Sequence, residues 1–574
     1  MWAWQPYFRR QMEHRARQAL TALGANISVK ALLVGVRLPE VSNDHRVCIE
    51  PEDGEWDISI FQDVHRRTKE IFSSHPDHNI FYGDEISMRD QPENIRRKSV
   101  REAIQEVLNK IDLEHGTCSF CAVPVRLGNF HVAPILQVTQ SDIDAFPRLT
   151  NPIQFDITEF YGYSSTTGIV QALISHLLEE ASNNLDTKEP GRSLDTFDSD
   201  LSSVLRKAGH TLCNAILLAV KDFGLHGIFE DLNRISELRY EGGETLGTII
   251  FAPSDLPSVK YDAIFLQSIA LESHKLVRKV VEISDNQFSC ICTGRKGVVG
   301  FGSVQEFGDT PVFKAVFTGH YRWELYVDDT LLMKCAFGVP YVPQPRLTEE
   351  AFFSNIRRVL PGLTQHQGKA LWNAVSVAMD QPHGTMLVVS DEASKEAKRL
   401  SSQAIAIEPI KLTSALMKRI SGIDGAVLVD RDCTCYAIGV ILDGIATKDG
   451  DPSRGARYNS ALRYITSSKA HTVCLVVSED GYVNMVPTLR PQIRKKDVEY
   501  YVNQLKSLNS DNYHETLSWL EKHRFYLTQE QCDIVNAELS RILAEPQDVG
   551  EIRPIPRKFE PDPEMNESYY FDDS

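Results

Sequence analysis

The sequence lacks the features that would place the protein in a membrane, in an oxidising compartment or on nucleic acid. No uninterrupted apolar run within its 574 residues approaches the roughly 20 residues that a membrane-spanning helix needs. Lys and Arg total 61 against 78 Asp and Glu, and this net charge of -17 argues against a protein dominated by contacts with nucleic-acid phosphates. The 11 cysteines are odd in number and scattered among apolar segments, as in a reducing compartment. We therefore expect a cytoplasmic protein with neither a membrane nor a nucleic-acid partner.

Metal-binding cysteine motifs are also scarce. One Cys-x-x-Cys pair, Cys118 and Cys121, has His115 nearby, but no second pair stands at the spacing of a zinc site. A zinc site is one interpretation of this pair, and the favoured interpretation is that both cysteines are core residues on a strand.

The chain divides into regions of different pattern. Residues 1–150 alternate helical and strand-like pieces and predict an α/β domain. Residues 151–340 predict a β-rich α+β domain with a flexible polar insert near 182–203. The proline-rich stretch VPYVPQPRL (339–347) marks a linker, and 346–490 predict an independent α/β domain of common size.

The C-terminal part is polar. Residues 491–544 predict a helical extension. The last segment, 545–574, contains nine acids, three basic residues and five prolines, and this composition predicts a disordered acidic tail.

Three loops of the 346–490 domain combine residue types that suit phosphate chemistry. IDGAVLVD places Asp424 and Gly425 directly before an apolar strand, and VVSEDG places Ser478 and Glu479 at the end of another strand. SRGARYNSALRYI (453–465) predicts the first turn of a helix, whose unpaired amides attract anions. Carboxylates beside such a turn fit metal-assisted phosphoryl or nucleotidyl transfer.

Within that first turn, Gly455 lets a ligand approach the backbone, and the guanidinium of Arg457 can fork onto phosphate oxygens. Simpler interpretations stay open for each loop taken alone: Asp424 as a turn residue, Ser478 as a turn hydroxyl with Glu479 as a hairpin-turn residue, and the 453–465 stretch as a capped helix with a surface arginine.

Taken together, the motifs from 381 to 485 resemble the diadenylate cyclase domain, the nucleotide-binding domain of the DisA type. DGAVLVD contains the family's Asp-Gly-Ala motif unaltered. GARYNSA and the later LVVSEDG stand where the family has its Gly-Thr-Arg-His-Arg motif and its Ser-Glu turn. The large N-terminal regions are similar to the sensor regions fused to such cyclases in bacteria, although the resemblance identifies no sensed ligand.

The resemblance implies a mixed-sheet α/β nucleotide-binding domain that joins two ATP molecules into cyclic di-AMP with Mg²⁺ or Mn²⁺. Two such domains, each holding one ATP, would meet face to face in a homo-oligomer. The resemblance implies Asp424 and Arg457 as the catalytic residues. Asp424 would bind metal and help to activate the attacking 3'-hydroxyl, and Glu479 would be the second metal carboxylate. The expected substrate-binding residues are Gly425, Leu442 on the adenine, Gly455, Ala456, Arg457, Tyr458, Ser460 and Ser478.

Two positions depart from the family motif, with Tyr458 in place of its His and Asn459 in place of its second Arg. The loss of a guanidinium removes a bidentate phosphate contact. The sequence therefore supports two hypotheses, a sensor-regulated diadenylate cyclase and a module that binds a nucleotide or cyclic dinucleotide with reduced or no turnover. A scaffold without a ligand is a third interpretation, which leaves the joint motif unexplained.

Overall fold

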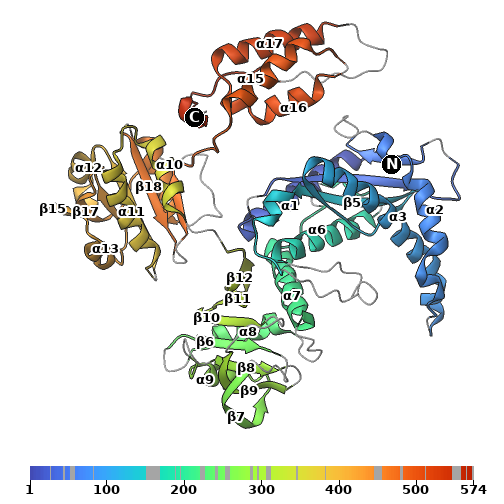
Figure 1. Cartoon of the computed structure of the whole chain (residues 1–574), viewed down its shortest axis with the longest axis horizontal. Coiled ribbons are helices and arrows are strands. Elements are labelled where there is room, and N and C mark those ends of the chain that lie inside the picture. The colour runs from blue at the N-terminus through green and yellow to red at the C-terminus, as the bar shows by residue number, and fades with distance from the viewer. Residues whose placement is uncertain are drawn as a thin grey trace. The chain divides into compact units, whose positions relative to one another are not determined.

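The computed structural model describes residues 1–25, 27–42, 45–51, 58–81, 83–149, 168–187, 189–193, 196–219, 227–239, 243–252, 259–284, 289–293, 296–304, 312–343, 347–381, 383–444, 456–468, 470–478, 482–510, 512–545, 557–563 and 565–571. The chain divides into two compact units, Met1–Pro343 and Gln344–Ser574 (Figure 1). The division falls within the proline-rich stretch. In the described part of the chain, no helix is long and apolar enough to cross a membrane.

The first unit begins with an antiparallel sheet between helices. The strands are β1 (Val29–Arg37), β2 (Val47–Glu50), β3 (Thr117–Cys121), β4 (Val125–Leu127) and β5 (Phe130–Thr139), in the order β2-β1-β5-β3 with β4 also on β5. The helices are α1 (Gln5–Leu23), α2 (Val64–Ser74), α3 (Glu85–His115), α4 (Gln140–Asp144), α6 (Ile169–Leu185) and α7 (Leu201–Ala219). Successive β1 side chains face opposite ways, so Leu32 and Val34 pack in the cluster with α3, and Leu33 packs in the cluster with α1 and α6.

This packing differs from the boundary expected at residue 150. Helix α6 contacts α1 and β5, and its buried side chains join the same apolar core as those of α1. The core of the first domain therefore continues into helices that the sequence pattern assigns to the next one.

The flexible insert expected near 182–203 also differs from the structure over its described residues. The Trp2 indole donates to the Pro190 carbonyl at 2.8 Å, Arg15 donates to the Ser199 carbonyl at 2.7 Å, and the Phe197 ring lies 5.3 Å from Phe8. These contacts hold the segment against α1 and the residues just before it. The polar composition of the segment predicts flexibility, but these few long-range contacts fix its described residues in place.

The second part of this unit is rich in strands, as its sequence predicts. An eight-stranded sheet has the order β13-β12-β11-β10-β6-β8-β9-β7, with α8 (Ile228–Glu237) against β10 and β11 and α9 (His274–Val281) against β6 and β8. The strands are β6 (Leu246–Phe251), β7 (Val259–Ile269), β8 (Ser289–Thr293), β9 (Gly297–Val304), β10 (Phe313–Gly319), β11 (Arg322–Val327), β12 (Thr330–Ala336) and β13 (Val339–Tyr341).

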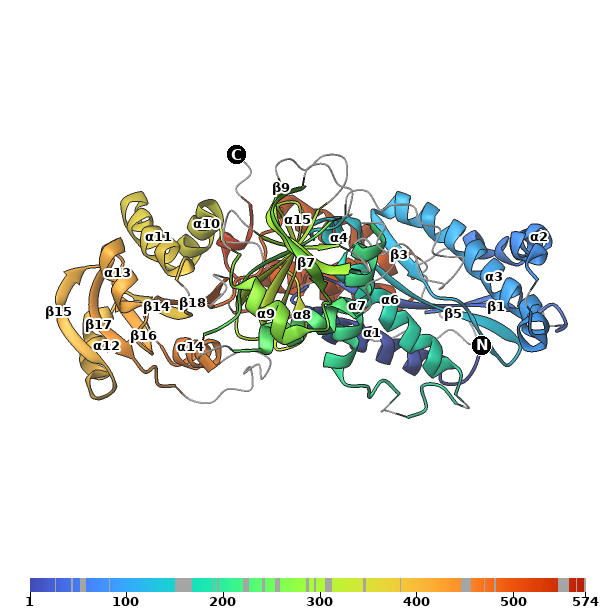
Figure 2. The same ribbon diagram turned by 90° about the horizontal axis from the view of Figure 1, so that it is seen from below.

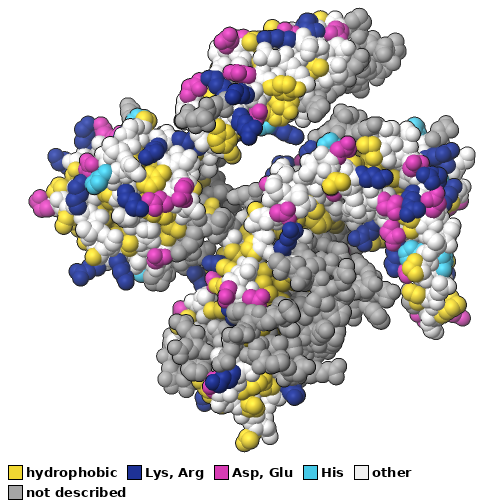
Figure 3. All heavy atoms as spheres, viewed as in Figure 1, with side chains coloured by type: hydrophobic (Ala, Val, Ile, Leu, Met, Phe, Trp, Pro, Cys, Tyr) yellow, Lys and Arg dark blue, Asp and Glu magenta, His cyan; other side chains and the backbone are white. Residues whose placement is uncertain are grey.

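Charged side chains of both signs lie interspersed on the face of the molecule in Figure 3. Exposed charged side chains also form ion pairs, as Arg67 of α2 does with Glu106 of α3 at 2.8 Å. Such exposed pairs add little stability individually.

The second unit contains the mixed α/β sheet expected for the C-terminal domain. Its order is β15-β17-β16-β14-β18-β19, in which β14 and β16 are parallel and every other neighbouring pair is antiparallel. The strands are β14 (Thr385–Ser390), β15 (Ile405–Lys411), β16 (Ala426–Val429), β17 (Thr434–Val440), β18 (Thr472–Val477) and β19 (Val483–Val486).

Helices cover both faces of this sheet (Figure 2). Helices α10 (Glu349–Val359), α11 (Gln365–Met379) and α13 (Ser414–Ile420) lie on one face, and α12 (Ala393–Arg399) and α14 (Ala456–Ser467) lie on the other. Strands β14, β16 and β18 are therefore buried along their whole length, which explains their unbroken runs of apolar residues.

The C-terminal helices form a core of their own, made by α15 (Lys495–Gln504), α16 (His514–Lys522) and α17 (Gln529–Leu543). The expectation of a disordered tail over 545–574 is wrong for residues 557–563 and 565–571. Phe559, Tyr569 and Tyr570 are at least 94% buried in this core, and the Phe559 amide donates to Asn536 at 2.9 Å. Burial of these aromatic rings offsets the acidic, proline-rich composition.

We predict that Phe559→Ala loosens this helical core strongly and Phe571→Ala hardly at all. Phe559 is 2% exposed and lies under the guanidinium of Arg524 at 4.0 Å, whereas Phe571 is 51% exposed. Removal of a buried Phe costs about 3–5 kcal/mol, so amide hydrogen exchange in α17 should accelerate by at least roughly a hundredfold. Equal exchange rates in the two variants would show that the tail does not stabilise the helices.

Candidate nucleotide site

The register of the mixed sheet brings two of the predicted loops, together with the predicted site residue Leu442, to one edge. Ala426 at the start of β16 pairs with Val440 at the end of β17, and Thr385 at the start of β14 pairs with Val477 at the end of β18. Residues 424–425, 441–442 and 478 therefore follow or precede their strands at the same edge. Strands β14 and β16 both begin at this edge, so it is the amino end of the parallel pair. Strands β17 and β18 run in the opposite direction and end at the same edge.

Asp424 projects from this edge toward the first turn of α14. Its side chain is 90% exposed, and its Oδ1 accepts the Gly425 amide at 3.0 Å. The same oxygen lies 3.7 Å from Nη2 of Arg457, whose side chain is 42% exposed. The structure thus brings together the carboxylate and the guanidinium that the sequence separates by 33 positions, and both remain open to a ligand.

Gly425 is required by the backbone at this edge. Its φ of +104° is unfavourable for any residue with a side chain, and an added Cβ would lie 2.6 Å from the carbonyl carbon of Gly439. Gly439 also has a positive φ, of +59°. The start of β16 and the end of β17 therefore touch backbone to backbone, which fixes the direction in which Asp424 leaves the strand.

Helix α14 begins at Ala456, in agreement with the helix start expected in the 453–465 stretch. Ala461 and Tyr464 are buried against the sheet and hold the helix in place. The start of the helix contains Arg457, the half-buried Tyr458 and the half-buried Ser460. The Tyr458 hydroxyl lies 3.4 Å from the Thr488 hydroxyl. Gly455 lies outside the described residues.

Ser478 closes the hairpin between β18 and β19. Its amide and its hydroxyl donate to the Tyr482 carbonyl at 2.9 and 3.0 Å, and the Tyr482 amide donates to the Ser478 hydroxyl at 3.1 Å. This geometry supports the turn interpretation of Ser478. Glu479 lies outside the described residues, so its place as a second metal carboxylate stays a prediction.

Leu442 follows β17 and is half-buried. It packs against the cluster that joins the sheet to α12 and α14, which includes Ala461 and Tyr464. Leu442 is therefore held beside the helix that presents Arg457.

Family models match three consecutive parts of the chain. Residues 1–213 match "Probable sensor domain DACNG", 226–329 match "Probable sensor domain DACNH", and 372–488 match "DisA bacterial checkpoint controller nucleotide-binding". The protein is a DisA-type nucleotide-binding domain fused to two probable sensor domains. The resemblance drawn from the sequence motifs is thereby confirmed.

Two solved structures are similar to part of the chain. A double mutant of DacA from Staphylococcus aureus is 19% identical over 20% of this chain and 78% of its own, with a TM-score of 0.18. A protein described as a hypothetical membrane spanning protein from Bacillus cereus is 23% identical over 24% of this chain and 66% of its own, with a TM-score of 0.20. A search of curated proteins finds no match.

Among the described residues of the nucleotide-binding domain, no group of three or more His, Cys, Asp or Glu side chains could hold a metal ion unaided. The exposed Asp424 carboxylate nevertheless fits Mg²⁺ or Mn²⁺, which use one or two carboxylates together with substrate phosphates. The buried cysteines of this domain are unsuited to thiolate chemistry, because burial raises the pKa of Cys433 to about 12 and that of Cys435 to about 11.

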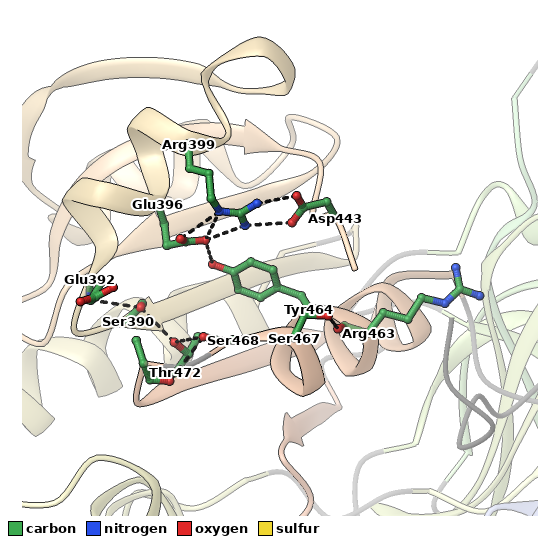
Figure 4. Close-up of polar contacts among 11 residues, drawn as sticks. Ser390, Glu392, Glu396, Arg399, Asp443, Arg463, Tyr464, Ser467, Ser468 and Thr472 are labelled. Carbon is green, nitrogen blue, oxygen red and sulfur yellow. Dashed lines mark hydrogen bonds and ion pairs between the residues drawn. The ribbon is translucent and has the colours of Figure 1, made fainter. Parts of the chain in front are cut away.

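Four side chains near this site were not predicted from the sequence. They form a chain of hydrogen bonds, shown in Figure 4, and are Glu396, Arg399, Asp443 and Tyr464. The spacing of Glu396 and Arg399 indicates a local helical pair, which is a weak signal. Asp443 stands 44 positions from Arg399, and no local pattern connects them.

Proposed function

We propose that the C-terminal domain is a diadenylate cyclase, regulated by the N-terminal sensor domains, that condenses two ATP molecules into cyclic di-AMP. The observation that supports this most is the Asp424 carboxylate 3.7 Å from the Arg457 guanidinium, which lies in the first turn of α14. A carboxylate for a metal and cationic groups for phosphate are the parts that nucleotidyl transfer needs.

Each side chain takes a separate task in this proposal. Arg457 and the first-turn amides of α14 bind phosphate oxygens, and Leu442 contacts the adenine. Asp424, with Glu479, would hold Mg²⁺ or Mn²⁺, which supplies charge neutralisation and lowers the pKa of a bound hydroxyl. Asp424 also orients the 3'-hydroxyl toward the α-phosphate of the facing ATP.

The overall reaction forms two 3'–5' phosphodiester bonds and releases two pyrophosphates and two protons. Because each domain binds one ATP, the bonds can form only where two domains meet face to face, and we propose a homo-oligomer in which they do. The ligand that the sensor domains bind is left open by this proposal.

A second candidate function is a module that binds a nucleotide or cyclic dinucleotide with little or no turnover. The residues that favour it are Tyr458 and Asn459, which replace a His and an Arg of the family motif. Tyr458 can still donate one hydrogen bond, and Asn459 can support the loop but lacks the paired donors of a guanidinium, so binding would survive these changes better than catalysis.

Asp424→Asn should abolish formation of cyclic di-AMP while ATP still binds. Asn keeps the oxygen that accepts the Gly425 amide but removes the charge that a divalent cation requires. Chromatography of products with Mg²⁺ or Mn²⁺ checks this, with Asp432→Asn at the other end of β16 as the control. Full activity of Asp424→Asn would contradict the assigned role.

Arg457→Ala should weaken ATP binding by roughly tenfold to more than a hundredfold, since a charge-assisted contact with phosphate contributes about 1.5–3 kcal/mol. The stability cost should be about 0.5 kcal/mol or less, because the side chain is exposed at a helix start. Calorimetric titration and thermal melting measure the two effects. Arg463→Ala, on the same helix and exposed, is the matched control and should bind ATP like the wild type. Unchanged affinity in Arg457→Ala would leave α14 as a helix start without a ligand.

Asn459→Arg restores the second guanidinium of the family motif and should leave turnover unchanged or raise it. Initial rates of cyclic di-AMP formation, compared at equal ATP occupancy, give the measurement. A large loss of rate would show that the first turn of α14 does not follow the family's path.

A further inference from the structure

A chain of four polar side chains joins α12, α14 and the segment that follows β17 (Figure 4). Nη2 of Arg399 donates to Oδ1 of Asp443 at 2.9 Å and to Oε2 of Glu396 at 2.7 Å. The Tyr464 hydroxyl of α14 donates to the same Glu396 oxygen at 2.8 Å. The guanidinium thus links two carboxylates, one from its own helix and one from the 441–444 segment.

The charges of these groups match their hydrogen-bonding roles at neutral pH. Arg399 holds the pKa of Asp443 and that of Glu396 below their usual values, and burial raises the pKa of Tyr464 above its ordinary value. Both carboxylates therefore accept, and the guanidinium and the phenol donate.

The 441–444 segment is held at two successive residues. Asp443 is bound to α12 through Arg399, and Gly444 lies against the backbone of α14, because an added Cβ would be 2.6 Å from the carbonyl carbon and oxygen of Arg463. Leu442, immediately before them, is half-buried in the cluster that contains Tyr464.

The same chain also fixes the helix that presents Arg457. Tyr464 is 2% exposed and stands seven positions after Arg457, which is about two turns or roughly 10 Å along the axis and nearly the same face of the helix. A rotation or slide of α14 that broke the Tyr464–Glu396 bond would therefore displace the Arg457 guanidinium as well.

We infer that Glu396, Arg399, Asp443 and Tyr464 are positioning residues that set the distance between the adenine side of the site, at Leu442, and its phosphate side, at Arg457. This inference rests on the proposed function. The ion pair itself is about half exposed, with Arg399 and Asp443 each at 46%, so its contribution to stability is small. Its effect should be on ligand geometry.

The test compares Asp443→Asn with the wild type in the full-length chain, with ATP and inorganic tripolyphosphate as probes. ATP must reach both sides of the site, whereas tripolyphosphate needs only the α14 side. We expect ATP affinity to fall by roughly three- to tenfold and tripolyphosphate affinity to change by less than about twofold, with the melting temperature within about 2 °C. Tyr464→Phe, which frees α14, should weaken both ligands.

Asp391→Asn provides a matched control in the same domain. Asp391 follows β14 and accepts from Nη2 of Arg431 at 2.6 Å, at the carboxyl ends of β14 and β16 and so at the opposite edge of the sheet. It should bind ATP like the wild type, and the conservative Arg399→Lys should retain part of the affinity that Arg399→Ala loses.

Normal ATP affinity in Asp443→Asn, or equal losses for ATP and tripolyphosphate, would overturn the inference and leave the proposed function standing. An equal loss of ATP affinity in Asp391→Asn would show that the loss in Asp443→Asn is a general effect on the domain, and this result would also overturn the inference. Failure of the wild type to bind ATP at all would overturn both.

Discussion

The contact between the backbones of Gly425 and Gly439 is the constraint on which the candidate site depends. It brings the start of β16 against the end of β17 so closely that an added Cβ on Gly425 would lie 2.6 Å from the neighbouring carbonyl carbon. Asp424 immediately precedes this contact in the chain, and Leu442 is the second residue after β17. Because both faces of the central strands β14, β16 and β18 are buried, polar side chains are accessible to a ligand at the ends of these strands.

The parts of the site that follow from short-range causes could be predicted from the sequence. The start of α14 at Ala456, the turn before β16 and the hairpin closed by Ser478 each depend on residues within a few positions of one another. The pairing of Arg399 with Asp443 could not be predicted, because it depends on the register of β17 and on where α12 packs. A single sequence contains no local trace of such a contact.

Composition predicts the structure poorly where a few apolar residues decide the packing. The composition of the acidic tail predicts disorder, yet Phe559, Tyr569 and Tyr570 supply enough apolar area to pack the described residues 557–563 and 565–571 on α15 and α17. The polar segment after α6 is similar, since Phe197 and the bonds to Trp2 and Arg15 tie it to α1. The boundary expected at residue 150 also differs from the structure, because buried side chains of α6 belong to the same apolar core as those of α1 and β5.

Whether the first turn of α14 supports turnover or only binding decides between an enzyme and a binding module. Product formation by the wild type is therefore the measurement that tests the central claim most directly. Purified full-length protein is incubated with ATP and Mn²⁺ or Mg²⁺, and nucleotides and pyrophosphate are quantified together. The account predicts cyclic di-AMP with two pyrophosphates released for each molecule formed. Tight ATP binding without cyclic dinucleotide under either metal, in every oligomeric state that the protein adopts, would contradict it.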